Sequence, residues 1–367
     1  MISSARNGGT VHRAFICGPA QWLIIGAKER ALRLSAVLLL TTAILAGAAG
    51  GGYHMITKFQ IGGEGGWDYA TADADARRLY VSHGTQVEVL DLDSGTVFGK
   101  ISDTPGVHGI AIAAELNRGF ISAGRASKVK IFDLKTLKTT GEAATGRNPD
   151  AIIYDPASKR VFAFNGGTAN ATVIDARSGN VDGTIPLGGR PEFATADGAG
   201  NVYVNLEDKS AVVKIDSQQM TTSEKWPLAP CEEPSGMAID AQHHRLFIGC
   251  SNKMMAVVNA ENGKVITTLP IGQGVDANGF DPGTGLAFSS NGEGTLTVVH
   301  EDTPDKFKVV ENVKTQRGAR TMALDLKTHN VLLPVADFGP APEATAEQPR
   351  PRPAIMAGSF AVLVVGP

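Results

Sequence analysis

The sequence has few charged residues and few cysteines, and each shortage excludes a class of protein. Only 19% of the 367 residues are charged, whereas 43% are hydrophobic. Such a chain can bury a large core, and its composition is not that of a disordered protein. The three cysteines, Cys17, Cys231 and Cys250, do not form a zinc-binding cysteine cluster. The composition therefore predicts a globular protein.

Familiar catalytic motifs are also missing. The sequence contains no H-E-x-x-H motif, no G-x-S-x-G motif, no P-loop and no C-x-x-C-H motif for covalent haem. The glycine-rich segment 62–66 lies between two expected strands, so it lacks the helix N-terminus that a phosphate site requires. We therefore favour a protein that is not an enzyme, and we keep an enzyme as the alternative.

The apolar run at residues 34–45 is too short to span a membrane, which takes about 20 residues. Basic residues precede this run and small residues follow it, as in a secretory signal peptide. We expect residues 1–49 to be a leader and the mature protein to be periplasmic or secreted. A retained membrane anchor is the alternative. Residues 1–30 lie upstream of the usual start of such a signal and point to a start codon assigned too early.

Loss of the leader would make the chain more acidic. The full chain has a net charge of −3, and residues 1–49 carry five basic residues and one acidic residue, so the mature chain has a net charge of −7. Such a charge provides no general attraction to nucleic acid or anionic lipid. We expect a monomer whose partner is a small molecule or a periplasmic protein.

A repeat of about 42 residues determines the expected architecture. Seven apolar segments end in a small turn residue, and their last residues are spaced by 40 to 44 positions. This spacing is close to the length of one four-stranded propeller blade. The segments are Trp67–Asp73, Val107–Ala113, Pro149–Asp155, Pro191–Asp197, Pro234–Asp240, Val275–Asp281 and Ala319–Asp325.

Further short apolar stretches follow each segment and are typical of strands, as at Arg78–Ser82 and Gln86–Asp91 in the first blade. Many of these stretches end in Asp followed by Gly or another turn residue, as in Asp91 to Gly95. A carboxylate can cap backbone amides in such a turn, and glycine accepts the positive φ that the turn often needs. We therefore predict that the aspartates at the turns are structural.

The segments Arg78–Ser82 and Val87–Asp91 resemble the YVTN-repeat, YncE-like propeller family, and the resemblance covers nearly the whole mature chain. It implies an all-β protein, a seven-bladed β-propeller that is often exported. Blade two departs from the pattern because Ala113 replaces Asp, and blade seven is interrupted. The resemblance also implies single-stranded DNA binding. The charge of −7 and the lack of an aromatic and basic stripe argue against that function.

The two ends of the expected propeller complement each other. The last blade lacks its fourth strand, whereas an additional strand, His54–Ile61, precedes blade one. We predict a single propeller over residues 50–367 in which the N-terminal strand completes the C-terminal blade and leaves no open edge. The interruption in that blade, residues 337–353, contains five prolines. We expect a mobile loop there, either a lid or an insertion without a role.

A ring of polar residues is expected at the mouth of the central channel. The loop into each innermost strand emerges on the same face of a propeller as the loop after each second strand. The residue one place after each repeat start therefore lies at this mouth. These residues are Asp68, His108, Asp150, Glu192, Ser235, Asp276 and Arg320.

Carboxylates around a narrow opening can bind calcium or another divalent metal, or shift one another's pKa values. In a metal-assisted hydrolase of lactonase or esterase type, Asp150, Glu192 and Asp276 would be ligands or acid and base groups. His108 would be the proton acceptor in that enzyme. The alternative is a hydrated channel whose acidic groups pair with arginines, for which the candidates are Arg147, Arg190 and Arg320. Further oxygen-rich residues are expected on the same rim: Asn165, Asn205, Ser251, Asn252 and Asn291.

Two cysteines, Cys231 and Cys250, belong to the mature chain, since Cys17 lies in the leader. Both are expected on the mouth face, and an oxidising compartment would allow them to form a disulfide. The alternative is two separate thiols. The pair His243 and His244 falls in a turn on the opposite face, where we favour a solvated turn over a metal site.

Overall fold

The computed structural model describes residues 52–343 and 353–367. The predicted leader, with its apolar segment 34–45 and Cys17, lies outside the described residues. The same is true of positions 344–352 in the proline-rich insertion. In the two described ranges, no helix is long and apolar enough to cross a membrane.

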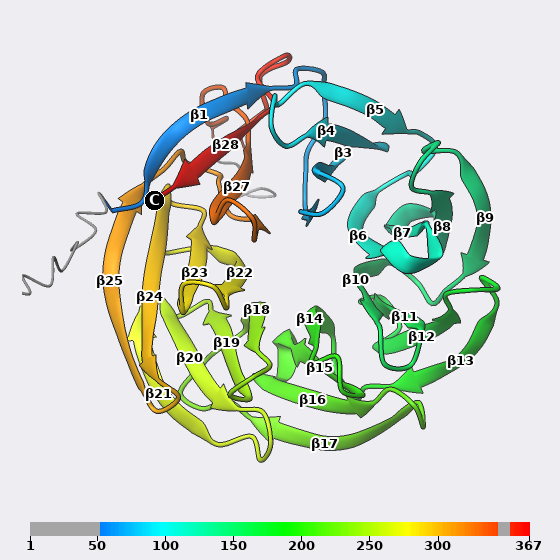
Figure 1. The fold of residues 1–367 in the computed structure, drawn as a ribbon, viewed down its shortest axis with the longest axis vertical. Coiled ribbons are helices and arrows are strands. Elements are labelled where there is room, and N and C mark those ends of the chain that lie inside the picture. Colours follow the sequence, from blue (N-terminus) through cyan, green and yellow to red (C-terminus); the bar gives the residue numbers. More distant parts are fainter. Residues whose placement is uncertain (1–51, 344–352) are drawn as a thin grey trace, which may run out of the picture. The chain divides into compact units, whose positions relative to one another are not determined.

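The described residues form seven antiparallel sheets of four strands each, arranged in a ring (Figure 1). The predicted seven-bladed β-propeller is confirmed. Three short 3₁₀ helices lie in the connecting turns, namely η1 (Ala114–Leu116), η2 (Gly124–Ala126) and η3 (Glu207–Lys209).

Each blade contributes one strand to each of four concentric layers. The innermost strands are β2 (Ala70–Asp73), β6 (Val107–Ala113), β10 (Pro149–Asp155), β14 (Pro191–Ala196), β18 (Pro234–Asp240), β22 (Val275–Asp281) and β26 (Ala323–Asp325). The second strands are β3 (Arg78–His83), β7 (Arg118–Ala123), β11 (Arg160–Asn165), β15 (Asn201–Leu206), β19 (Arg245–Cys250), β23 (Leu286–Asn291) and β27 (Asn330–Val335).

The outer two layers complete the blades. The third strands are β4 (Gln86–Asp91), β8 (Lys128–Asp133), β12 (Asn170–Asp175), β16 (Ala211–Asp216), β20 (Met254–Asn259), β24 (Thr295–Thr303) and β28 (Ala361–Gly366). The outermost strands are β5 (Val97–Ile101), β9 (Thr139–Ala144), β13 (Val181–Pro186), β17 (Thr221–Pro227), β21 (Val265–Pro270), β25 (Lys306–Lys314) and β1 (His54–Gln60).

Two innermost strands begin later than the repeat predicts, at Ala70 instead of Trp67 and at Ala323 instead of Ala319. In blade one the reason is a local hydrogen bond, because the Asp68 amide donates to the Ser82 hydroxyl at 2.8 Å and not to a strand carbonyl. Regular pairing of β2 with β3 starts only at Ala70.

The aspartates that end the third strands are structural, as predicted. Asp91 and Asp175 each accept a hydrogen bond from a backbone amide in the turn that follows, Ser94 N at 2.9 Å and Ser178 N at 2.6 Å. At the ends of first strands, Asp155 and Asp281 accept similar bonds. In blade two, where Ala113 stands in place of Asp, the chain forms the helix η1 instead. That helix ends at Asn117, which adopts a left-handed conformation with φ of 52°.

Ring closure follows the prediction. Strand β1 pairs antiparallel with β28, in a register that places His54 opposite Gly366 and Gln60 opposite Ala361. Figure 1 shows β1 in blue beside β28 in red. Blade seven thus contains both ends of the described chain, and its sheet order is β1-β28-β27-β26.

The core lies between adjacent blades, where apolar side chains from the second and third strands pack against each other. Phe120, Phe162 and Phe247 are fully buried on three second strands. Ring contacts join neighbouring blades, as between Tyr80 and Phe132, whose centroids are 5.8 Å apart. This packing fixes the blades and so fixes the spacing of the inner strands that carry the polar ring.

Candidate functional site

A β-bulge near the start of the inner strands brings the predicted ring residues to the mouth. In blade two, His108 and Gly109 lie opposite the single residue Ser122, whose hydroxyl accepts a hydrogen bond from the Gly109 amide at 2.8 Å. The register of β10, β14, β18 and β22 shifts at the equivalent place. Bulges redirect side chains and are common at barrel rims. The sequence period alone does not reveal them.

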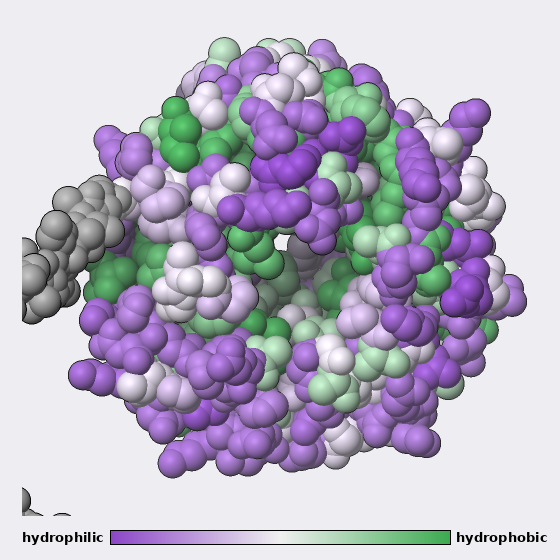
Figure 2. Space-filling model, viewed as in Figure 1, coloured by the Kyte–Doolittle hydropathy of each residue, from purple (hydrophilic) through white to green (hydrophobic). Residues whose placement is uncertain are grey.

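The mouth contains a cavity of about 870 Å³. Five of the predicted ring residues line it: Asp68, Asp150, Glu192, Asp276 and Arg320. The other two, His108 and Ser235, contact members of this group. Deeper in the channel lies a smaller cavity of about 380 Å³ with Tyr69, Ile110 and Phe193 in its wall. Viewed along the ring axis, the centre is open and hydrophobic surface is visible inside it (Figure 2).

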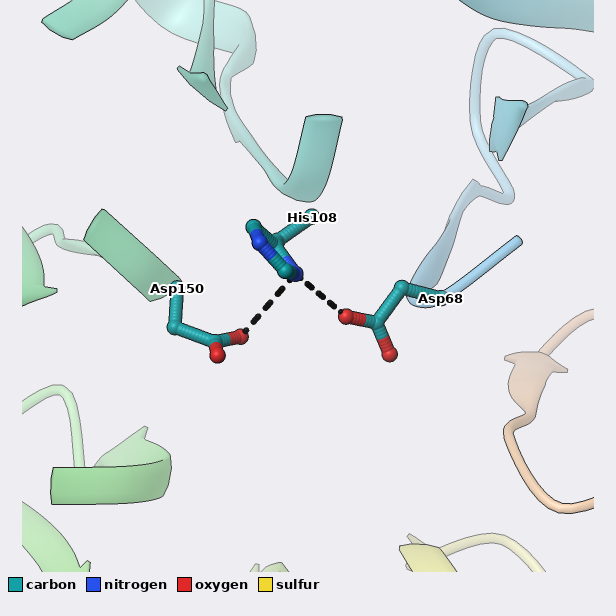
Figure 3. Close-up of side chains that lie close together, drawn as sticks. All are labelled: Asp68, His108 and Asp150. Carbon is teal, nitrogen blue, oxygen red and sulfur yellow. Dashed lines mark hydrogen bonds and ion pairs between the residues drawn. The ribbon is translucent and has the colours of Figure 1, made fainter. Parts of the chain in front are cut away.

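His108 lies between two carboxylates from the neighbouring blades (Figure 3). Its Nδ1 atom is 2.6 Å from Asp68 Oδ2 and 3.6 Å from Asp150 Oδ1. Burial opposes protonation of the imidazole, but the hydrogen bond to Asp68 and the charge of Asp150 raise the pKa of His108 overall. One nitrogen and two carboxylate oxygens within 4.8 Å of one another form a set that can hold a metal ion.

Arg320 binds the acidic groups on the other side of the mouth. Its Nε donates to Asp276 Oδ2 at 2.6 Å, and its Nη2 lies 3.7 Å from Asp68 Oδ1. Ser235 donates a hydrogen bond to the other oxygen of Asp276 at 3.0 Å. Asp276 is thus engaged by protein groups on both oxygens, whereas Asp150 and Glu192 are not.

Acidic groups at the mouth outnumber the two arginines that line the same cavity, Arg317 and Arg320. Burial raises the pKa of Glu192 to about 9, and the neighbouring Asp150 and Asp276 add to this effect. Burial also raises the pKa of Asp150 to about 7, although His108 opposes the shift. Within the two described ranges, no hydrogen bond or ion pair reaches the Glu192 carboxyl group. At neutral pH these carboxyl groups are therefore protonated in part, and a bound cation would favour their ionised form.

Aromatic and apolar residues of the mouth were missed by the sequence analysis. Trp67, Phe338 and Ile355 line the cavity. Phe338 and Ile355 form a β-bridge at the base of the proline-rich insertion, and the ring of Phe338 lies 6.1 Å from that of Trp67. Trp67 stands at a repeat start, which was a usable signal. No pattern in the insertion marks its base as part of the cavity.

Cys231 and Cys250 form the predicted disulfide on the mouth face of blade five, with their Cα atoms 5.4 Å apart. Cys250 is the last residue of β19, and Cys231 lies in the loop that leads into β18. The bridge therefore links the loop to the strand beside it, next to the position of Ser235.

Several residues expected on the rim have other roles. Three asparagines, Asn165, Asn205 and Asn291, are fully buried and bond within or between blades, as between Asn205 Nδ2 and the Ser235 carbonyl at 2.6 Å. The expectation that they line the rim is wrong, because their strands continue to these residues. Ser251 is exposed and Asn252 is half-buried, and both bond to the loop that carries Cys231.

Of the three arginines expected to pair with the ring, one does so. Arg320 contacts Asp276 and Asp68, as described above. Arg147 donates to the Gly167 carbonyl at 2.9 Å, and Arg190 pairs with Glu207 outside the ring. The acidic ring is therefore only partly neutralised by these arginines.

Fold and site together define a seven-bladed β-propeller with an acidic cavity at one end of its channel. Neither a protein-family model nor a curated protein matches the sequence. Among solved structures, the chain is similar to Kuenenia stuttgartiensis hydrazine synthase at 15% identity and a TM-score of 0.65. That match covers 74% of this chain and 92% of the other.

Two further structures have the same architecture. U3-55K is 7% identical with a TM-score of 0.68, and the match covers 84% of this chain and 98% of that one. The RRP9 WD40 repeats are 7% identical with a TM-score of 0.69, and the match covers 85% and 97% of the two chains. Identities this low show a shared fold and leave the function to be argued from the site.

Proposed function

We propose that this protein is an exported β-propeller of the YVTN-repeat type that binds a divalent cation at its acidic channel mouth. The observation that carries the proposal is the convergence of four carboxylates and one imidazole, from five blades, on one cavity whose wall holds two arginines, Arg317 and Arg320. The disulfide between Cys231 and Cys250 supports the proposed export, because such bonds persist in oxidising compartments.

The best ligand set for the cation is Asp68, His108 and Asp150. Their ligand atoms lie within 4.8 Å of one another, and the two carboxylates line the cavity. Sequence analysis grouped Asp150 with Glu192 and Asp276, but Asp276 is engaged by Arg320 at 2.6 Å. Glu192 is left as an additional acidic group that favours a positive ligand.

Space remains for a small molecule beside the cation. The cavity of about 870 Å³ falls within the usual size range of ligand sites. Its wall combines carboxylates with Trp67 and Phe338, so a ligand with one apolar and one polar side fits the lining best. A binding role with a small molecule or a periplasmic protein as partner agrees with this arrangement.

The proposal is tested by titrating the full chain with Ca²⁺ and with Mn²⁺ in a calorimeter. We expect a saturable site that is lost in an Asp68→Asn, Asp150→Asn double variant. The matched control is Asp75→Asn with Glu261→Gln, which removes the same charge from two exposed positions. It should bind as the natural sequence does. If neither cation binds saturably, or if both double variants behave alike, the mouth is not a cation site.

A second candidate function is metal-assisted hydrolysis of a lactone or ester. It is favoured by the position of the ligand set, because a cation held by Asp68, His108 and Asp150 would face the cavity and could activate a water there. His108 Nδ1 points at the two carboxylates, so we now place this residue among the ligands of the cation and not as a free proton acceptor.

Hydrolysis is tested with a panel of lactones and aryl esters in the presence of Mn²⁺. An Asp150→Asn variant should lose at least about a hundredfold in kcat, whereas a Glu261→Gln variant should keep its activity. Rates equal to the buffer background in the natural sequence would exclude this candidate and leave the binding function in place.

A further inference from the structure

A second cluster of potential metal ligands lies on the opposite face of the propeller, between blades five and six. It consists of Asp240, the last residue of β18, His243 in the following turn, and Glu301 on β24. His243 Nδ1 is 2.5 Å from Asp240 Oδ2 and 3.3 Å from Glu301 Oε1. Ser235 at the other end of β18 belongs to the mouth, so the two sites are separated by a whole strand.

Glu301 is the unusual member of this cluster. Its side chain is 4% exposed, and both of its carboxyl oxygens are buried without a hydrogen-bond partner among the described residues. The proton of His243 Nδ1 serves Asp240, which is closer. A buried carboxylate without donors is costly unless a positive charge compensates it.

The neighbouring arginine does not supply that charge by direct contact. Arg245 donates its Nε proton to the Pro304 carbonyl at 2.6 Å and Nη1 protons to the carbonyls of His243 and His244. Its remaining ion pair is with Asp305 at 3.2 Å, and the Asp305 side chain is 80% exposed. The guanidinium therefore holds the turn against the hairpin and leaves the oxygens of Glu301 unpartnered.

Blade six is built to bring Glu301 to this place. Strands β24 and β25 are nine residues long, whereas each third and outer strand of the other six blades has five to seven residues. The extension carries Glu301, Pro304 and Asp305 beyond the end of a normal blade and against the β18–β19 turn of blade five.

We propose that Asp240, His243 and Glu301 bind a divalent transition-metal ion of the zinc class. One imidazole nitrogen and two carboxylate oxygens are a common donor set for such ions, and all three atoms lie within 4.8 Å of one another. In a tetrahedral zinc site, ligand atoms are about 3.4 Å apart, so the cluster needs only a small adjustment. The His243 side chain is 39% exposed, which leaves a route for the ion and room for a water ligand.

The test separates this site from the mouth. The full chain carrying Asp68→Asn and Asp150→Asn is titrated with Zn²⁺, and its bound zinc is counted by elemental analysis after desalting. We expect one zinc ion per chain. Adding Glu301→Gln or His243→Ala should weaken zinc binding by at least about tenfold. Adding His244→Asn, at the exposed neighbour of His243, should leave it unchanged; asparagine suits the left-handed φ of 56° at this position.

Two further measurements, the absorption of bound Co²⁺ and the unfolding temperature, distinguish loss of the site from loss of the fold. The visible absorption of bound Co²⁺ should show tetrahedral coordination in the background variant and lose it with His243→Ala. Added zinc should raise the unfolding temperature of the background and not that of His243→Ala, a change at a partly exposed turn that the fold tolerates. Absence of zinc from the background variant overturns the proposal. An affinity unchanged by both Glu301→Gln and His243→Ala overturns it too, and Glu301 is then a protonated carboxyl beside Asp240.

Discussion

The two ends of the inner strands carry the same type of residue in different surroundings. At the end away from the mouth, Asp155, Asp281 and Asp325 each bond to the turn that follows. At the mouth, carboxylates from successive blades face one another across a cavity. The first group satisfies the local backbone, whereas the second leaves carboxyl groups available for a ligand.

The pKa values express this difference. Burial works against ionisation of Asp325, but hydrogen bonds from Thr328 and Arg77 lower its pKa overall. Burial of Glu192 and its acidic neighbours raise the pKa of that residue to about 9. A repeat can therefore supply carboxylates at both ends of its inner strands, which stabilise the fold at one end and serve binding at the other.

The largest expected loss of stability comes from removing an aspartate at the end of an inner strand away from the mouth. Asp325 has a side chain that is 3% exposed and accepts hydrogen bonds from Arg77 at 2.8 Å and Thr328 at 2.7 Å. Asp325→Ala should lower the free energy of unfolding by about 3 kcal/mol, because it leaves these donors without their partner. Urea unfolding measures this loss. Asp75→Ala, at a side chain that is 96% exposed, is the control and should have no measurable effect.

Removal of the disulfide should have a similar effect at the mouth end. The bridge joins residues 19 positions apart, and a loop of this length is worth about 3 kcal/mol in the chain-entropy model. A Cys231→Ala, Cys250→Ala variant should lose about that much in urea unfolding. Reduction of the natural sequence should reproduce the loss. A change below about 1 kcal/mol would mean that the loop is held by its other contacts.

Glu192→Gln should raise the free energy of unfolding, because it removes a buried carboxyl group that has no partner at the mouth. The pKa of Glu192 is raised from 4.5 to about 9 in the folded protein, so the folded state binds a proton that the unfolded state releases. Stability from this group is present below pH 4 to 5 and is lost as the pH rises through about 9. In metal-free buffer at pH 8, the free energy of unfolding of the variant should exceed that of the natural sequence by at least about 2 kcal/mol. At pH 4 the two should be equal, and a constant difference would contradict the assignment.

The smallest effect concerns the affinity of the mouth for its proposed cation. Asp150 has a pKa of about 7, so binding below that pH displaces a proton. The pKa of His108 is also raised, so a second proton is displaced from this ligand. The affinity for Mn²⁺ should therefore rise by at least about tenfold per pH unit from pH 5 to pH 7 and change less above it. Calorimetry in two buffers of different ionisation enthalpy measures the proton release. An affinity independent of pH would place the cation away from Asp150.

Most of the fold follows from the repeat. Each blade has the same period of apolar strands and turn residues, so the number of blades, the strand positions and the closure by β1 are all visible in the sequence. The strand ends at the mouth are less visible. Their position depends on bulges and on single hydrogen bonds, such as the one from the Asp68 amide to Ser82, which no periodic pattern encodes.

Prediction of the site succeeds where a residue has the same place in every blade and fails where one blade differs. The polar ring was found because its members follow the repeat. Phe338 comes from an insertion and Glu301 from an extended hairpin, so neither has an equivalent elsewhere in the repeat. The buried asparagines were misplaced because their strands run one residue further than the apolar pattern suggests.

Closure of the ring by β1 and β28 also has a consequence for the order of assembly. Strand β28 is made about 300 residues after its partner β1, so blade seven cannot form until the other six blades have left the ribosome. Arg320 enters the mouth with this last blade, where it meets Asp68 and Asp276. Partly synthesised chains would therefore carry the acidic groups without their arginine, and the finished mouth is a property of the closed ring alone.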